Sequence, residues 1–172
     1  MKRYQLLAGS VLAALSIPAL AHPGGHDAGF WQGFVHPFTG VDHLVAMAFL
    51  GFWLSSLSRA TASKTLFAAI AVFAGGIVMG GQLSSAQVAW VELSVLASAG
   101  VMIVLAGCRA QLGAAAPIVA AAAFAGHGLA HGAEASAQVL PFTVGASLAM
   151  AILASVASLT LYSARQRFHK AA

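Results

Sequence analysis

Two short segments of the sequence bring histidines together with carboxylates. Residues 36–43 read His-Pro-Phe-Thr-Gly-Val-Asp-His, and residues 127–134 read His-Gly-Leu-Ala-His-Gly-Ala-Glu. Both segments abut or lie within apolar stretches, where an ionisable side chain is costly and therefore indicates a functional site. Imidazole and carboxylate ligands without a thiol suit nickel, cobalt or zinc and argue against copper(I). The residues alone do not choose among these three metals.

The second segment has the spacing of a metal site on a helix. His127, His131 and Glu134 stand at positions i, i+4 and i+7, so a helix presents them on one face. Two histidines one turn apart with a nearby carboxylate form a common metal-binding arrangement. Such histidines also occur as packing residues held by hydrogen bonds. A second group of ligands at the same predicted membrane depth favours the metal site.

The first segment lies at the start of a predicted membrane helix. Pro37 favours a break before that helix, and Thr39 is a candidate cap. We therefore expect His36 to fold back over the helix mouth toward Asp42, with His43 beside them as a further ligand. The alternative is that Asp42 and His43 are only capping residues at the membrane interface.

Three more residues are candidate ligands. Glu92 lies early in the predicted span at residues 88–107, and no Lys or Arg is predicted at the same membrane depth. The partner of Glu92 must therefore be a histidine, a bound metal or its own proton. His22 and His26 lie in a glycine-rich arm, where they either capture metal or form a polar leader. We include all three in the predicted site.

Composition places these residues in a membrane protein. Of the 172 residues, 60% are hydrophobic and only 7% are charged, whereas a soluble domain carries about 25% charged residues. Spanning a bilayer takes about 20 mostly apolar residues in a helix. We therefore expect an all-α bundle of five transmembrane helices at residues 34–57, 66–83, 88–107, 117–132 and 139–163.

Charged residues and an N-terminal signal predict what precedes and follows this bundle and how it is oriented in the membrane. Residues 1–21 have the basic start, apolar run and Ala-Leu-Ala site of a cleaved signal peptide. We expect a His-containing extracytoplasmic arm at 22–33, the bundle at 34–163 and a basic cytoplasmic tail at 164–172. Every Lys and Arg after residue 21 falls on one side of the predicted membrane, and all four acidic residues with six of the seven histidines fall on the other. The positive-inside rule then predicts N-terminus out and C-terminus in. We expect the membrane to be the bacterial inner membrane.

The cysteine, the basic residues and a pair of glycines exclude some kinds of site and indicate how the helices pack. The single cysteine, Cys108, excludes an internal disulfide and a cysteine-rich metal site, and it is predicted to be a packing residue. The basic residues are too few and too scattered to bind nucleic acid. Gly76 and Gly80 have the GxxxG spacing of close helix–helix contacts.

Together these motifs resemble the HupE/UreJ family over essentially the whole mature chain. The resemblance rests on the His-Pro-x-x-Gly-x-Asp-His pattern of residues 36–43, the Ala-Met pair at 46–47, and the His-Gly and His-Gly-Ala-Glu elements of residues 127–134. Members of that family are regarded as nickel, sometimes cobalt, permeases that serve hydrogenase or urease maturation. The resemblance supplies the choice of nickel and implies functional roles for His36, Asp42, His43, Glu92 and residues 131–134.

We therefore expect a facilitative or ion-coupled nickel uptake permease, with the metal as substrate, no resident cofactor and no enzymatic activity. Its partners would be the lipid bilayer and a cytoplasmic nickel acceptor, with a homo-oligomer left open. The main alternative is a metal sensor or delivery protein without transport. A bis-histidine haem protein and a metal-dependent membrane enzyme are further rivals. The inner half of the predicted bundle has no ionisable residue, so the sequence leaves the ion's path there open.

Overall fold

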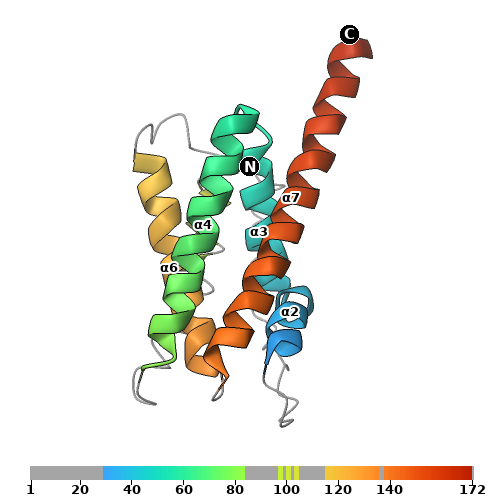
Figure 1. Ribbon diagram of the computed structural model, residues 1–172. Coiled ribbons are helices and arrows are strands. Elements are labelled where there is room, and N and C mark those ends of the chain that lie inside the picture. The colour runs from blue at the N-terminus through green and yellow to red at the C-terminus, as the bar shows by residue number, and fades with distance from the viewer. Residues whose placement is uncertain are drawn as a thin grey trace, which may run out of the picture.

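The computed structural model describes residues 29–83, 97–98, 100–101, 103–104, 115–135 and 138–171. This part of the chain has no strand, and the predicted all-α class is confirmed. Most of the predicted third span lies outside the described residues. The elements are α2 (Phe30–Thr39), α3 (Val41–Leu54), α4 (Arg59–Gly80), α6 (Ala115–Glu134) and α7 (Val139–Ala171). Helices α3, α4, α6 and α7 run alongside one another, and α2 lies at one end of them (Figure 1).

Two of these helices are long and apolar enough to cross a membrane by themselves. They are α4 and the Val139–Arg167 part of α7. Helices α2 and α3 meet the same test only as one bent pair, and α6, which occupies the fourth predicted span, is not among the candidates. The described residues thus contain two or three candidate spans of the five predicted.

The first predicted span is not one continuous helix. Helices α2 and α3 meet at Gly40 at an angle of 82°. Gly40 has extended backbone (φ −97°, ψ 125°), and a Cβ on it would meet the His43 ring and lie 2.7 Å from Oδ1 of Asp42. The chain therefore breaks at a residue where an added side chain would displace the side chains of Asp42 and His43.

The predicted break at Pro37 and cap by Thr39 were wrong. Pro37 lies inside α2, two residues before its end, so the hydrogen bond lost to the missing N–H affects only the last turn. The Thr39 hydroxyl donates to the backbone oxygen of His36 at 2.8 Å. No side chain caps the start of α3. Pro37 and Thr39 favour a helix break or a helix start at their own positions, but α2, packed on the bundle, continues through both residues and ends before Gly40.

Reciprocal glycine contacts bring α4 and α6 into backbone contact. A Cβ on Gly76 would lie 3.0 Å from the Cα of Gly128, and a Cβ on Gly80 would lie 2.9 Å from the Cα of Gly132. The predicted close contact at Gly76 and Gly80 is therefore confirmed. Gly76 and Gly80 pack against a second pair with GxxxG spacing on α6, Gly128 and Gly132. Each glycine of this second pair directly follows a histidine in the sequence. Backbone contact between α4 and α6 thus sets the position of the α6 histidines.

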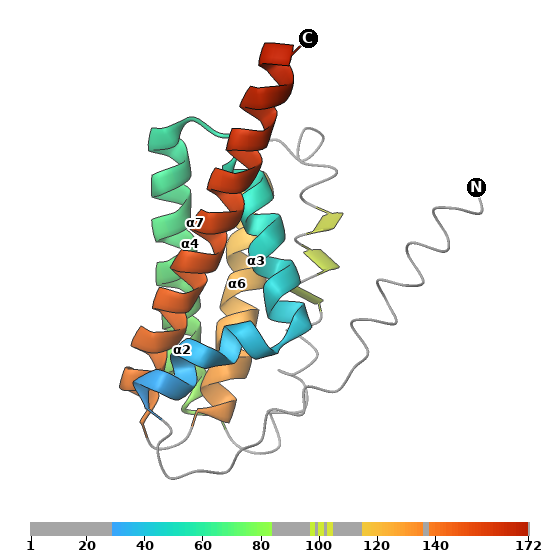
Figure 2. The same ribbon diagram turned by 90° about the vertical axis from the view of Figure 1, so that its right-hand side faces the viewer.

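Helix α7 forms the other main contacts of the bundle. Its Gly145 packs against the backbone of Phe30 and Phe34, and Gly33 of α2 packs in turn against the backbone of Phe142. Beyond the bundle α7 continues to Ala171, so the predicted tail is helical and projects past the other helices (Figures 1 and 2). The core between the helices is apolar and includes Ala46, Met47, Leu50, Phe73, Ile77, Phe124, Phe142, Met150 and Ala154.

Candidate metal centre

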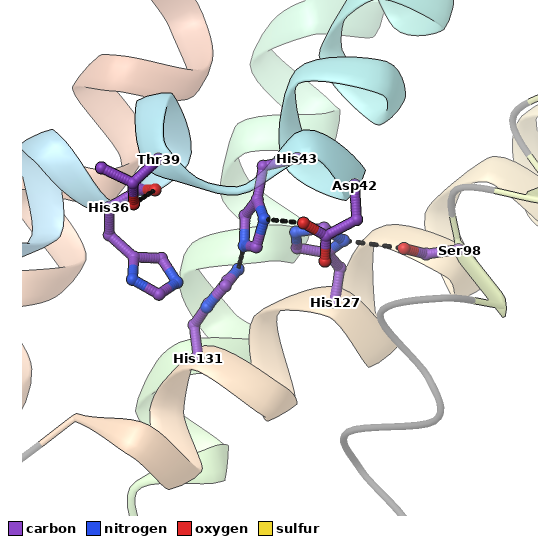
Figure 3. A network of polar contacts seen from close by, with 7 residues as sticks. All are labelled: His36, Thr39, Asp42, His43, Ser98, His127 and His131. Carbon is purple, nitrogen blue, oxygen red and sulfur yellow. Dashed lines mark hydrogen bonds and ion pairs between the residues drawn. The ribbon is translucent and has the colours of Figure 1, made fainter. Parts of the chain in front are cut away.

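Four histidines from three helices converge at the end of the bundle where α3 and α7 begin. His36 comes from α2, His43 from α3, and His127 and His131 from α6 (Figure 3). The 82° bend places His36 beside the start of α3, with its ring centroid 4.9 Å from that of His43, whereas the sequence predicted an approach to Asp42. The tight α4–α6 contact brings the α6 histidines to the same place.

Three of these side chains are placed to share one ion. The ligand atoms of His36, His43 and His131 all lie within 4.8 Å of one another. Nε2 of His43 is 2.7 Å from Nε2 of His131, and the His131 ring centroid is 4.6 Å from that of His36. His43 and His131 are only 5% and 1% exposed. Imidazoles in such a buried cluster could serve as a ligand set for a divalent transition metal.

Asp42 acts on this cluster through His43. Its Oδ1 lies 2.7 Å from Nδ1 of His43. An ionised carboxylate only accepts hydrogen bonds, so Nδ1–H of His43 is the donor, and Nε2 is the ring nitrogen through which His43 can bind a metal. Nε2 faces His131, on the side where the three imidazoles meet. Asp42, predicted as a direct ligand, is thus placed to orient His43 and to raise its basicity, an arrangement common at metal sites.

We predict that Asp42→Asn weakens metal binding without dispersing the cluster. The amide oxygen can still accept from Nδ1–H of His43, but the negative charge is lost. Loss of such a supporting group typically costs about 10- to 100-fold in metal affinity. Titration of the purified protein with Ni²⁺ should show this decrease, and Asp42→Ala, which also removes the acceptor, should bind more weakly still. Equal affinity of Asp42→Asn and the unchanged protein would contradict the role of the charge.

His127 lies one turn before His131 on α6 and is fully enclosed. It is 1% exposed, and its ring centroid is 4.8 Å from those of His43 and His131. Its Nδ1 is hydrogen-bonded to the hydroxyl of the buried Ser98 at 2.7 Å. Ser98 was not predicted as a site residue, because an isolated hydroxyl on an apolar segment carries no distinguishing signal. His127 is thus a second, adjacent imidazole position beside the group of three.

Aromatic rings line the histidine cluster. The Phe73 ring of α4 is centred 5.8 Å from His127 and 5.7 Å from His131, and the Phe142 ring of α7 is 6.1 Å from His36. Apolar rings around a cation site lower the local dielectric constant, which strengthens the interaction between a cation and its ligands. Nothing in the sequence distinguishes these two phenylalanines from the eight others.

The structure brings together every predicted site residue whose side chain it describes. Glu134 ends α6, but its side chain is not among those described. Glu92, His22 and His26 lie outside the described residues, so their roles remain predictions. The residues brought together are His36, Asp42, His43, His127 and His131.

The cluster does not have the geometry of a bis-histidine haem site. A haem would place its macrocycle between two axial imidazoles. Here Nε2 of His43 and Nε2 of His131 are 2.7 Å apart, and the neighbouring ring centroids lie between 4.5 and 4.9 Å. The rings are too close together to admit a porphyrin, whereas a single ion could be held by the group of three.

Comparison with known proteins gives a family match over most of the chain. A family model described as HupE / UreJ protein matches residues 10–172. The curated relative Protein HupE of Rhizobium leguminosarum bv. viciae is 42% identical over 73 residues, which is 41% of this chain and 38% of that relative. The matched region therefore spans well under half of that relative's length. No solved structure matches the chain.

Proposed function

Because this chain belongs to the HupE/UreJ family, we propose that it is a membrane permease for nickel uptake. The ion would be captured on the histidine side of the membrane and released on the side of the basic α7 end. The orientation with the histidine side outward follows from the distribution of Lys and Arg in the sequence. Nickel is the transported substrate and not a resident cofactor.

One observation carries the proposal: His36, His43 and His131 reach a common point from three different helices. A permease must bind its ion and also release it. A site whose ligands lie on separate helices can be taken apart by a small movement of one helix. A structural metal site, by contrast, is closed on all sides by protein ligands.

The donor set favours a transition metal over magnesium and calcium, which prefer oxygen ligands. Three imidazoles leave further coordination positions for water or for His127, which lies next to the group. Cobalt and zinc accept the same donors. The preference for nickel rests on the family resemblance.

The proposed path runs from the group of three toward His127 and Ser98. Ser98 is 3% exposed and hydrogen-bonded to His127, so the segment that carries Ser98 lies against this side of the cluster. An inside-negative potential favours entry of a dication by about 2.3 kcal/mol per charge per 100 mV. Transport would be driven by this potential, by the ion gradient and by capture of nickel in the cytoplasm.

The test is accumulation of radioactive nickel in cells that lack their own nickel importers. We expect saturable uptake on expression of this chain, in excess of cells with an empty vector, and the same protein in liposomes should admit nickel when an inside-negative potential is imposed. Saturable nickel binding by the purified protein without uptake in either system would refute transport.

One observation favours a second candidate, a nickel sensor or delivery protein. Beyond the histidines the core is apolar, beginning with Met47 one turn after His43 and continuing through Leu50 and Phe124, which are 3%, 0% and 2% exposed. A protein that only binds metal needs no passage through this core. The liposome measurement separates the two candidates, because a sensor binds nickel but does not admit it.

A further inference from the structure

Helix α2 carries an apolar face that the bundle does not cover. Trp31, Val35 and Phe38 stand at positions i, i+4 and i+7, so they lie on one face, and they are 71%, 49% and 39% exposed. On the other side, Gly33 and Pro37 are buried, with Gly33 against the backbone of α7. The helix contains no Lys, Arg, Asp or Glu.

The direction of α2 distinguishes it from the spanning helices. It makes an angle of 82° with α3 and lies across the end of the bundle (Figure 2). Ten residues of helix are about 15 Å long, which is half the thickness of the hydrocarbon core. When α4 and α7 cross a bilayer, α2 therefore lies nearly along the membrane plane, and it is too short to span by itself.

We propose that the Trp31–Val35–Phe38 face of α2 binds the lipid interface of the leaflet on the histidine side. Tryptophan is enriched at this depth because its ring is amphipathic. An uncharged helix that lies along the membrane with one apolar face outward matches the boundary between headgroups and acyl chains. The exposed face continues onto α3 at Val41 and Leu44, which are 46% and 39% exposed.

Lipid is a better occupant of this face than a second copy of the chain. The spanning helix α7, on which α2 packs, exposes its own apolar residues at regular spacing: Leu140, Val144, Leu148, Ile152, Val156 and Leu159. Exposed apolar residues on α7, α2 and α3 alike are what a bilayer covers. The bound leaflet would also hold α2, and with it His36, over the metal site.

A spin label on α2 tests the depth of this face. In a Cys108→Ala background, Val35→Cys is labelled and compared in lipid nanodiscs with two matched positions on α7. Leu148→Cys starts from a similarly exposed residue, 45% against 49%, and lies about 14 Å along α7 from its start, near the middle of a span. The second position is Gln166→Cys, because Gln166 is exposed and lies near the basic end of the same helix.

The measurement is the ratio of collisions with oxygen, which concentrates in lipid, to collisions with chromium oxalate, which stays in water. We expect the ratio at Val35 to fall between those at Leu148 and Gln166. A ratio equal to that at Leu148 would mean that α2 is inserted deeply, and one equal to that at Gln166 that the face is in water. Protection from both reagents would mean that protein, such as a second copy, covers it. Each of these three results overturns the proposal.

This test is independent of nickel transport. If Val35 has the interfacial ratio and no nickel is taken up, α2 docks on lipid and the permease proposal fails. If nickel is taken up and the ratio is that of Leu148, transport stands and interfacial docking fails. Should the Val35→Cys protein fail to fold, Phe38→Cys on the same face gives the same comparison.

Discussion

Replacing His131 by alanine is expected to abolish nickel uptake. His131 lies at the centre of the cluster, with its ring centroid 4.6 Å from His36, 4.5 Å from His43 and 4.8 Å from His127. Its removal leaves two imidazoles of the group of three and removes the α6 side chain that contacts His36, while His127 of α6 still lies beside His43. Loss of a direct ligand should exceed the 10- to 100-fold cost typical of a supporting residue, so we expect at least about 100-fold weaker nickel binding.

Radioactive nickel accumulation and nickel titration of the purified protein measure this effect at matched membrane expression. His43→Ala should lower nickel uptake and nickel affinity as much as His131→Ala does, because each variant lacks one of the two side chains in the 2.7 Å Nε2–Nε2 contact. His169→Ala is the control, since His169 lies among the basic residues of the C-terminal segment in the sequence, between Arg167 and Lys170. Normal uptake by both cluster variants would show that nickel does not pass through this site.

Replacing Gly80 by alanine is expected to damage the site from a distance. Gly80 lies on α4, which carries no histidine, and an added Cβ would meet the backbone oxygen of Leu129 and lie 2.9 Å from the Cα of Gly132. Backbone atoms cannot yield as a flexible side chain would, so α4 and α6 must separate. Overpacking of this kind typically costs about 1–3 kcal/mol. We expect thermal unfolding in detergent to occur several degrees lower, and nickel affinity to fall because His127 and His131 move with α6.

Gly75→Ala is the matched control on the same helix. A Cβ at Gly75 would meet nothing within 4 Å. Alanine is the better helix former by about 0.8–1.0 kcal/mol, so this variant should be as stable as the unchanged protein or slightly more stable. Equal losses in Gly75→Ala and Gly80→Ala would mean that helix propensity or membrane insertion, and not the α4–α6 contact, explains the effect.

Much of the site was predictable because ligand chemistry is carried by residue type. His127 and His131 lie four apart in an apolar helix, and Asp42 and His43 begin another, so both groups could be identified before any fold was known. The helical class was predictable for a related reason. In a bilayer the backbone must satisfy its hydrogen bonds within each segment, and apolar length reveals such helices.

The bend at Gly40 was not predictable, because the local signals pointed to Pro37 and Thr39 instead. Apolar composition continues from residue 34 to 57, and a hydropathy pattern does not distinguish one long helix from two helices at 82°. Which residue breaks the helix depends on close contacts of α2 with α7 and of Gly40 with His43, and these exist only in the packed bundle.

Side-chain types and runs of apolar residues in the sequence are enough to predict the candidate ligands, the membrane setting and the helical class. The tertiary structure adds how the candidate ligands lie relative to one another. It placed His36, His43 and His131 around one point, made Asp42 a partner of His43, set Ser98 against His127 and laid α2 across the bundle. These relations join residues far apart in the chain through backbone contacts at glycines, and such contacts depend on the relative positions of whole helices.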